Sequence, residues 1–275
     1  MRHDHATARP HGADRRARPR SRVQRLLDPL YSLLRFIARH VSGFWGALAA
    51  FLTAGLIAGF TAGAVFLLIA GIVTRGITQT TDERVLQWFA RHRTPALDEI
   101  MLEITSLGNG SFLILLVGIA SVFLWLTKHR WSVYLLLVGV LGGQLLSRAL
   151  KQIFDRDRPS VIEWVDQVSS PSFPSGHAMG SFIAYSAVAY VVGRLEPAPA
   201  LRRFTWALAA VLILAVGVSR MYLGVHYPSD VLAGFIGGLA WLGFVAASMT
   251  AVRFFAPRRP RTTREERDLM DPPGQ

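Results

Sequence analysis

The chain has 275 residues, of which 51% are hydrophobic and 17% are charged. The charged share is well below the roughly 25% of soluble globular domains, and the apolar residues are gathered in long segments. This composition excludes an ordinary soluble domain and favours a protein with several membrane-spanning helices. Cysteine is absent, which excludes a disulfide framework and a thiolate metal site.

The formal net charge of +12 is concentrated toward the two ends of the chain. The clustered arginines are Arg15, Arg16, Arg18, Arg20, Arg22, Arg25, Arg258, Arg259, Arg261, Arg264 and Arg267. Basic segments that flank apolar helices are typical of cytoplasmic ends that face anionic lipid headgroups. We therefore interpret the charge as a membrane feature and expect no nucleic-acid partner.

The first forty residues differ from the rest of the chain. Residues 1–24 contain few large apolar side chains and cannot bury enough surface to fold, so we expect disorder. Residues 25–40 carry apolar side chains at helical spacing, which predicts either an interfacial amphipathic helix or an extension of the first span. We divide the chain into a basic N-terminal arm (1–40), a membrane domain (41–252) and a basic cytoplasmic tail (253–275).

Six apolar segments predict six transmembrane helices packed as an all-α bundle. The expected spans are one within Phe44–Val73 and five at about Phe112–Leu126, Trp131–Leu150, Ala178–Val192, Phe204–Val218 and Val231–Val252. Residues 75–109 form short amphipathic pieces around Pro95, with Trp88 as a candidate interfacial anchor. We find no internal repeat.

Loop charge predicts the orientation of this bundle. Six spans place both termini on one side, together with the basic loops 128–130 and 194–203, so that side should be cytoplasmic. The outer side then holds the polar segments 75–109, 151–177 and 219–230. Charged groups and imidazoles are costly near a bilayer, so their convergence on one face indicates a functional site.

The first polar cluster follows the third span. Lys151 and Arg158 are seven residues apart and would share a face if the helix continued, although Pro159 disfavours helix at Arg158. Ammonium and guanidinium groups suit phosphate oxygens, but cations at a helix end are also common as snorkelling side chains. Arg156 lies between Asp155 and Asp157, which favours a local ion pair.

The second cluster, Pro174-Ser175-Gly176-His177, comes directly before the fourth span. Ser175 is a natural N-cap, and Gly176 lets the backbone approach a ligand closely. Free N–H groups at a helix start bind anions, which would place His177 beside a phosphate. A plain helix cap with a surface histidine is the alternative.

The third cluster runs from Ser219 and Arg220 to His226 and Asp230. His226 and Asp230 are four residues apart, within reach across one helical turn. A carboxylate on one ring nitrogen fixes the tautomer and leaves the other nitrogen free to attack. Asp230 also starts the sixth span, where the helix dipole favours an anion. A structural pair that caps this helix is the alternative.

Taken in order, the clusters resemble the signature of the type 2 phosphatidic acid phosphatase superfamily of integral membrane lipid phosphatases. That signature is Lys-x6-Arg-Pro, Pro-Ser-Gly-His and Ser-Arg-x5-His-x3-Asp. Residues 151–159, 174–177 and 219–230 match it at every defined position. The resemblance covers about residues 80–250 and implies a six-span bundle with its active site at the outer membrane face. The core is also similar to that of vanadium-dependent haloperoxidases, which are soluble.

The resemblance implies roles for the matching residues. His226 would be the nucleophile of a phosphohistidine mechanism, Asp230 would orient it, and His177 would be the general acid. The phosphate would be bound by Lys151, Arg158, Ser175, Gly176 and Arg220. No metal or other cofactor is implied. The outer-loop carboxylates show no metal-ligand spacing and are interpreted as solvated. They are Asp155, Asp157, Glu163 and Asp166.

The three motifs indicate the type of reaction but not the identity of the lipid substrate, because they bind the phosphate group rather than the lipid tail. A composition rich in Ala, Arg and Gly without Cys is typical of bacteria, so we expect the bacterial inner membrane. An outward-facing bacterial enzyme would suit undecaprenyl pyrophosphate, with phosphatidylglycerol phosphate and phosphatidic acid as alternatives. A phosphotransferase or a non-enzymatic lipid-phosphate transporter would also retain these features. The expected partners are the lipid phosphate substrate and membrane lipids.

Overall fold

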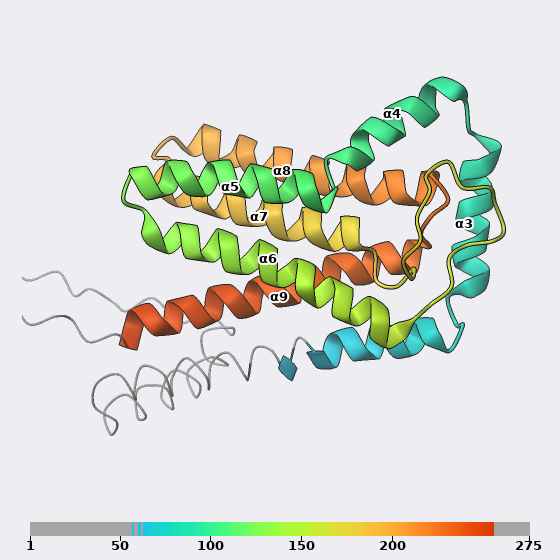
Figure 1. Cartoon of the computed structure of the whole chain (residues 1–275), viewed down its shortest axis with the longest axis horizontal. Helices are drawn as coiled ribbons and strands as arrows, with labels where there is room; N and C mark the ends of the chain where they lie inside the picture. The colour runs from blue at the N-terminus through green and yellow to red at the C-terminus, as the bar shows by residue number, and fades with distance from the viewer. Residues whose placement is uncertain (1–56, 58–59, 62, 256–275) are drawn as a thin grey trace, which may run out of the picture.

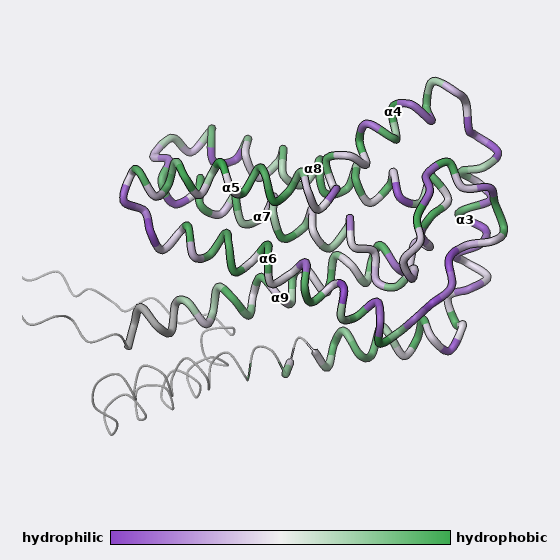
Figure 2. Tube along the Cα trace, viewed as in Figure 1, coloured by the Kyte–Doolittle hydropathy of each residue, from purple (hydrophilic) through white to green (hydrophobic). Residues whose placement is uncertain are grey.

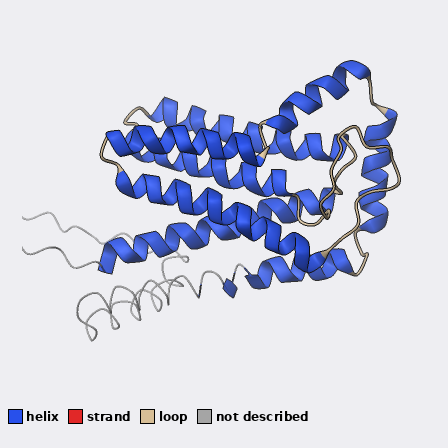
Figure 3. Cartoon of the chain, viewed as in Figure 1, coloured by secondary structure: helices blue, strands red, loops and turns tan. Residues whose placement is uncertain are grey.

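A computed structural model describes residues 57, 60–61 and 63–255, and all regular structure in these residues is helical (Figures 1 and 3). A helix over Gly63–Thr74 precedes seven labelled helices. These are α3 (Gln79–Arg91), α4 (Pro95–Ser106), α5 (Gly110–Leu126), α6 (Arg130–Phe154), α7 (Gly176–Leu195), α8 (Pro199–Tyr222) and α9 (Pro228–Phe255). The predicted all-α class is confirmed. The predictions for the N-terminal arm, for residues 44–56 and for the tail from 256 lie outside the described residues.

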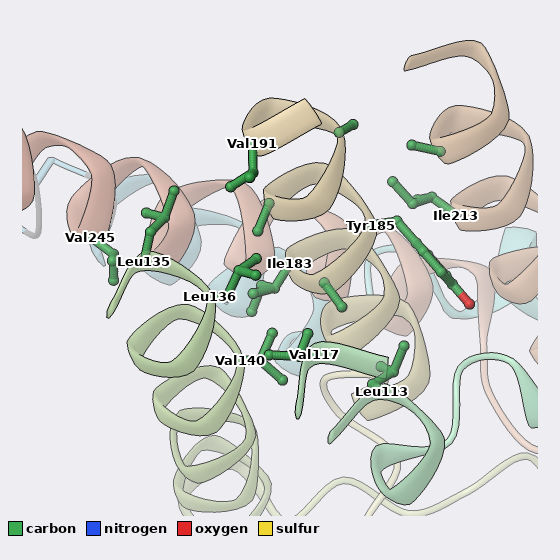
Figure 4. Close-up of a cluster of buried hydrophobic side chains, with 14 of the residues drawn as sticks. Leu113, Val117, Leu135, Leu136, Val140, Ile183, Tyr185, Val191, Ile213 and Val245 are labelled. Atoms are coloured by element: carbon green, nitrogen blue, oxygen red, sulfur yellow. The ribbon is translucent and has the colours of Figure 1, made fainter. Parts of the chain in front are cut away.

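The helices α5 to α9 run alongside one another, with α7 at the centre in contact with the other four (Figure 1). Small residues such as Ala184 and Ala187 on α7 are fully buried, which lets the neighbouring backbones approach closely. Large side chains from the surrounding helices, including Leu136 and Val140, fill the remaining space (Figure 4). This packing makes α7 a rigid support for the residues at its N-terminus.

The number of spans depends on how two bent helix pairs are counted. Among the described residues, α6, α7, α8 and Pro228–Met249 of α9 are each long and apolar enough to cross a membrane. Two more spans arise if Gly63–Thr74 joins α3 across a 78° bend and α4 joins α5 across a 46° bend. The described helices therefore fit four to six spans, and the six predicted spans are reached only if both bent pairs cross the membrane.

The short amphipathic pieces predicted around Pro95 are the helices α3 and α4. Pro95 occupies the first turn of α4, where its missing N–H costs no hydrogen bond, and the Thr94 side chain caps the helix by accepting from Leu97 N. Trp88 on α3 is half exposed, and its role as an interfacial anchor stays a prediction.

All three polar segments meet at one end of the bundle, as loop charge predicts. Helices α3 and α4, the connection between α6 and α7, and the α8–α9 turn lie together there (Figure 1). This end is richer in hydrophilic residues than the shaft of the bundle (Figure 2). Which side of the membrane this end faces stays a prediction.

Candidate active site

The first cluster does not lie on one continuous helix, so the condition for a shared helical face is not met, in line with the expected effect of Pro159. Helix α6 ends at Phe154, and Asp155 adopts a left-handed conformation with φ of 37°. Arg158 lies in the following connection, where its Nη1 donates to Val225 O at 2.5 Å. The chain reversal, rather than helical spacing, brings this guanidinium to the α8–α9 turn.

Lys151 lies in the last turn of α6 and faces the start of α7. A Cβ on Gly176 would stand 3.6 Å from Lys151 Cε and 3.3 Å from Ser147 Oγ, so the ammonium stem passes directly over this glycine. The Lys151 ammonium donates to Pro171 O in the connecting segment. The missing side chain at Gly176 thus keeps the helix N-terminus accessible beside a cation.

Ser175 is the N-cap of α7, as predicted. Its Oγ accepts from Ala178 N at 3.5 Å, and its own N–H donates to Asp230 O at 3.0 Å. The second bond requires α9 to approach the start of α7 very closely. Gly234 permits this approach, because a Cβ there would lie only 2.7 Å from Ser175 O. Gly234 is therefore a positioning residue that the motif does not contain.

His226 and Asp230 face each other in the buried α8–α9 turn. His226 Nδ1 lies 3.6 Å from Asp230 Oδ2 and 3.5 Å from Ser172 Oγ, while its Nε2 lies 3.4 Å from Arg158 Nη1. The first distance is slightly longer than a hydrogen bond, a common state of catalytic pairs without substrate. The Nδ1 side is thus occupied by the carboxylate, and Nε2 faces the cations.

Burial controls the charge of His226. Only 2% of its surface is exposed, and loss of water lowers its pKa to about 3, although Asp230 acts in the opposite direction. The imidazole is therefore neutral at physiological pH. A neutral ring with Nε2 unprotonated has the lone pair that a nucleophile needs.

Arg220 is fully buried and only partly satisfied. Its Nη1 donates to Thr105 Oγ1 at 2.9 Å and to Asp166 Oδ2 at 2.8 Å. Its Nε and Nη2 are buried without a hydrogen-bond partner in the described structure. Unpaired buried donors of a charged group are costly, so this guanidinium is prepared for an anion that supplies the missing acceptors.

The interpretation of Asp166 as a solvated carboxylate is therefore wrong. It pairs with Arg220 and is 29% exposed at its side chain. The local ion pair expected for Arg156 is also wrong, because this residue pairs with Asp82 and Asp230 instead of its sequence neighbours. Both pairings join segments far apart in sequence, so spacing alone carries no signal for them.

His177 occupies the first turn of α7, as predicted, and lies within electrostatic range of all the other cationic and imidazole groups of the site. Those groups are Arg220, His226, Lys151 and Arg158. No hydrogen bond to the His177 ring is present among the described residues. The ring packs beside Gly108, where a Cβ would stand 3.2 Å from His177 Cδ2. The ring is thus placed by packing, with its nitrogens available to a ligand.

The predicted residues therefore converge, with two histidines, three cations and a helix N-terminus close together at one end of the bundle. Within the described part of the chain, no group of three or more His, Asp or Glu side chains is arranged to hold a metal ion. The arrangement suits a phosphate group, whose charge the cations and N–H groups would balance.

Comparison with known proteins agrees with this chemistry. The family model of the PAP2 superfamily matches residues 132–254, a range that contains all three clusters. The chain belongs to the PAP2 superfamily, and it is a phosphatase of the membrane-spanning type.

Its relatives include phosphatidylglycerophosphatase B of Bacillus subtilis (strain 168), which is 36% identical over 175 residues, or 63% of this chain and 86% of that protein. The putative undecaprenyl-diphosphatase YbjG of Escherichia coli (strain K12) is 31% identical over 134 residues, or 46% of this chain and 63% of that protein. The crystal structure of a transmembrane PAP2 type phosphatidylglycerolphosphate phosphatase from Bacillus subtilis aligns with a TM-score of 0.63 at 32% identity. That alignment covers 74% of this chain and 98% of the other.

Proposed function

We propose that this protein hydrolyses the phosphate monoester of phosphatidylglycerophosphate, releasing inorganic phosphate and phosphatidylglycerol. The observation that carries the chemistry is the buried Arg220, whose two unpaired donors lie in the same cluster as the neutral His226. The choice of lipid is supported by the similarity to phosphatidylglycerophosphatase B over 86% of that protein's length.

Undecaprenyl pyrophosphate, the substrate expected from the sequence, is the second candidate. It is supported by the similarity to the putative undecaprenyl-diphosphatase of Escherichia coli, which covers 63% of that protein. We rank it second because this similarity extends over less of either chain.

An apolar cavity supports a lipid rather than a soluble substrate. A cavity of about 270 Å³ lies between the helix Gly63–Thr74, α6 and α9. Its lining residues are Gly63, Phe66, Leu146, Leu150, Gly237, Ala240, Trp241 and Phe244. One lining residue, Leu150, directly precedes Lys151 near the C-terminal end of α6. An acyl chain in this space would leave the headgroup at the site.

In the proposed mechanism, His226 Nε2 attacks phosphorus in line with the bond to the lipid oxygen. The N–P bond forms, the P–O bond breaks, and His177 gives its proton to the departing glycerol oxygen. Asp230 stabilises the positive charge that develops on the imidazole. Lys151, Arg158 and Arg220 hold the equatorial oxygens, where the transition-state charge lies. Arg158 stays a cation, although burial and the nearby Arg220 lower its pKa to about 10.

The second half of the reaction restores the enzyme. A water molecule attacks the phosphohistidine, and His177, now the base, takes the proton of that water. The P–O bond forms, the N–P bond breaks, and inorganic phosphate leaves. His177 recovers from water the proton that it gave to the glycerol oxygen, and the three cations balance the phosphate charge, so we propose that no metal is needed.

The decisive experiment measures phosphate release by the purified protein in detergent with EDTA, beside the variant His226→Ala. We expect release from phosphatidylglycerophosphate by the wild type alone. Faster release from undecaprenyl pyrophosphate would favour the second candidate. No release from either lipid by a folded wild-type protein would refute the lipid phosphatase proposal. Release by His226→Ala would refute the assignment of His226 as the nucleophile.

We further propose that the site faces outward in the bacterial inner membrane, with both termini in the cytoplasm. The absence of cysteine makes this orientation simple to test. Glu163 and His129 are exposed residues at opposite ends of the bundle, so a single cysteine can be introduced at either position. An impermeant maleimide applied to intact cells should label Glu163→Cys but not His129→Cys, and the reverse pattern would refute the orientation.

A further inference from the structure

We propose that Asp82 and Arg156 form a positioning relay that holds Asp230 in the orientation His226 requires. This inference rests on the proposed function. Neither residue belongs to the three-part signature, since Arg156 occupies an undefined position between Lys151 and Arg158. Asp82 lies on α3, outside the residues that the family model matches.

Arg156 is the centre of this relay. Its Nη1 donates to Asp230 Oδ1 at 2.6 Å and to Ser229 Oγ at 2.9 Å. Its Nη2 donates to Asp82 Oδ2 at 3.3 Å and to Gln79 Oε1 at 3.0 Å. The guanidinium also lies 4.2 Å from the centre of the Tyr227 ring. The planar guanidinium of Arg156 thus bridges two buried carboxylates, and its stacking on the Tyr227 ring restricts its orientation.

Asp82 anchors the relay to the first turn of α9. It is 2% exposed, and its Oδ1 accepts from Ser229 N at 3.0 Å. Its Oδ2 accepts from Ser229 Oγ and from Thr78 Oγ1. A buried carboxylate with this many partners cannot turn freely. Helix α3 therefore holds the turn that carries Asp230, although 147 residues separate Asp82 from Ser229.

The geometry at Asp230 explains why such a relay is useful. Arg156 occupies Oδ1, so Oδ2 is the oxygen that faces His226 Nδ1 and also accepts from Ser172 and from Tyr227 N. Without the guanidinium, Asp230 Oδ1 would lose its hydrogen-bond partner among the described residues, and the carboxylate plane could rotate away from the imidazole. The developing positive charge on His226 would then be less well stabilised.

Charge balance points the same way. Two cations, Arg158 and Arg220, already act on His226, and a further uncompensated arginine would oppose the charge that the histidine gains on attack. Asp82 gives Arg156 a second carboxylate partner. The relay therefore orients Asp230 without adding net positive charge beside the nucleophile.

The test compares Arg156→Gln, Arg156→Lys, Asp82→Asn and the double variant Asp82→Asn/Arg156→Gln. The substrate is phosphatidylglycerophosphate in detergent, and kcat, KM and the unfolding temperature are measured. We expect Arg156→Gln to lower kcat by about 10- to 100-fold, the loss seen when outer hydrogen-bond partners of metal-bound histidines and carboxylates are removed. KM should change by less than about threefold, because the relay does not touch substrate.

The other variants separate positioning from general stability. Arg156→Lys should retain part of kcat, since an ammonium can reach one carboxylate but cannot bridge both. The double variant should be no slower than Arg156→Gln alone, because Asp82 acts through Arg156. Arg93→Gln is the matched control: Arg93 joins the same end of the bundle by donating to Tyr222 O and Glu163 O, but it does not contact Asp230.

The outcomes are distinct. A wild type that releases no phosphate contradicts the proposed function. An active wild type with kcat of Arg156→Gln within twofold contradicts the relay alone. Equal losses of kcat and unfolding temperature in Arg156→Gln and Arg93→Gln would also overturn it, because they would show a purely structural role.

Discussion

The close approach of α9 to the start of α7 makes Gly234→Ala a sharp test of the site's assembly. A Cβ at this position would lie 2.7 Å from Ser175 O, 3.0 Å from Ala178 Cβ and 3.2 Å from Met179 N. Two of these neighbours are backbone atoms, so a side-chain rotation cannot relieve the contact. Reaching an ordinary van der Waals separation requires a movement of roughly 0.7 Å or more between the two helices.

This movement has two expected costs. Overpacking of this kind lowers the free energy of unfolding by about 1–3 kcal/mol, partly offset by up to about 1 kcal/mol because alanine favours helix. The same movement separates Ser175 N from Asp230 O, which are 3.0 Å apart, and displaces Asp230 from its partners. A displacement near 1 Å lowers rates by about 100-fold, so we expect phosphate release to fall by at least about 10-fold.

Gly243→Ala on the same helix is the matched control, because no described atom lies within 4 Å of a Cβ there. It should retain wild-type activity and equal or higher stability. Thermal unfolding in detergent and phosphate release are measured for both variants. If Gly234→Ala matches Gly243→Ala in both measurements, the interpretation that this glycine sets the α7–α9 distance is wrong.

Three further predictions concern individual side chains of the site. His177→Ala should slow a monoester substrate more than a pyrophosphate, since a glycerol alkoxide needs protonation more than a phosphate leaving group does; equal losses would argue against the general-acid role. Arg220→Lys removes the unpaired Nε and Nη2 donors. It should lower kcat/KM by about 10- to 100-fold, as expected for the loss of one or two charge-assisted hydrogen bonds. A change below threefold in the same assay would show that these donors do not bind phosphate. The pKa of His226 is about 3 in the folded protein and 6.5 in a model peptide, so between these values the unfolded state binds a proton that the folded state does not. Stability should therefore fall as pH decreases from 6.5 toward 3, by up to about 1.4 kcal/mol per pH unit from this group, and His226→Gln should show a shallower slope in pH-dependent unfolding.

The parts of the site that lie within one helical turn or one cap follow from the sequence. The Ser175 cap and the facing of His226 and Asp230 are local features, and the spacing of their residues predicts both. The gathering of the three clusters at one end follows from the alternation of apolar spans and polar loops. Hydrophobic periodicity and loop charge therefore predict the architecture, while the candidate residues follow from the spacing within the three clusters and their resemblance to the superfamily signature.

The remaining contacts depend on tertiary packing that no local pattern encodes. Arg220 takes its partners from Thr105 and Asp166, which are 115 and 54 residues away. Arg158 reaches the turn through an irregular segment after α6, so helical spacing could not place it. The bend of 46° between α4 and α5 likewise turns one predicted loop and one predicted span into a broken helix pair.

The way Asp230 is held also bears on when the protein becomes competent during its synthesis. Its side-chain partners Arg156 and Ser172, and Asp82, which pairs with Arg156, all precede it in the chain, while Asp230 itself lies in the first turn of α9. Until that helix emerges and docks, Arg156 lacks one of its two carboxylate partners and Ser175 N lacks its backbone acceptor. A ribosome-bound chain that has inserted only its earlier helices thus holds the cations but not the histidine–aspartate pair. Docking of α9 is the event that completes the site.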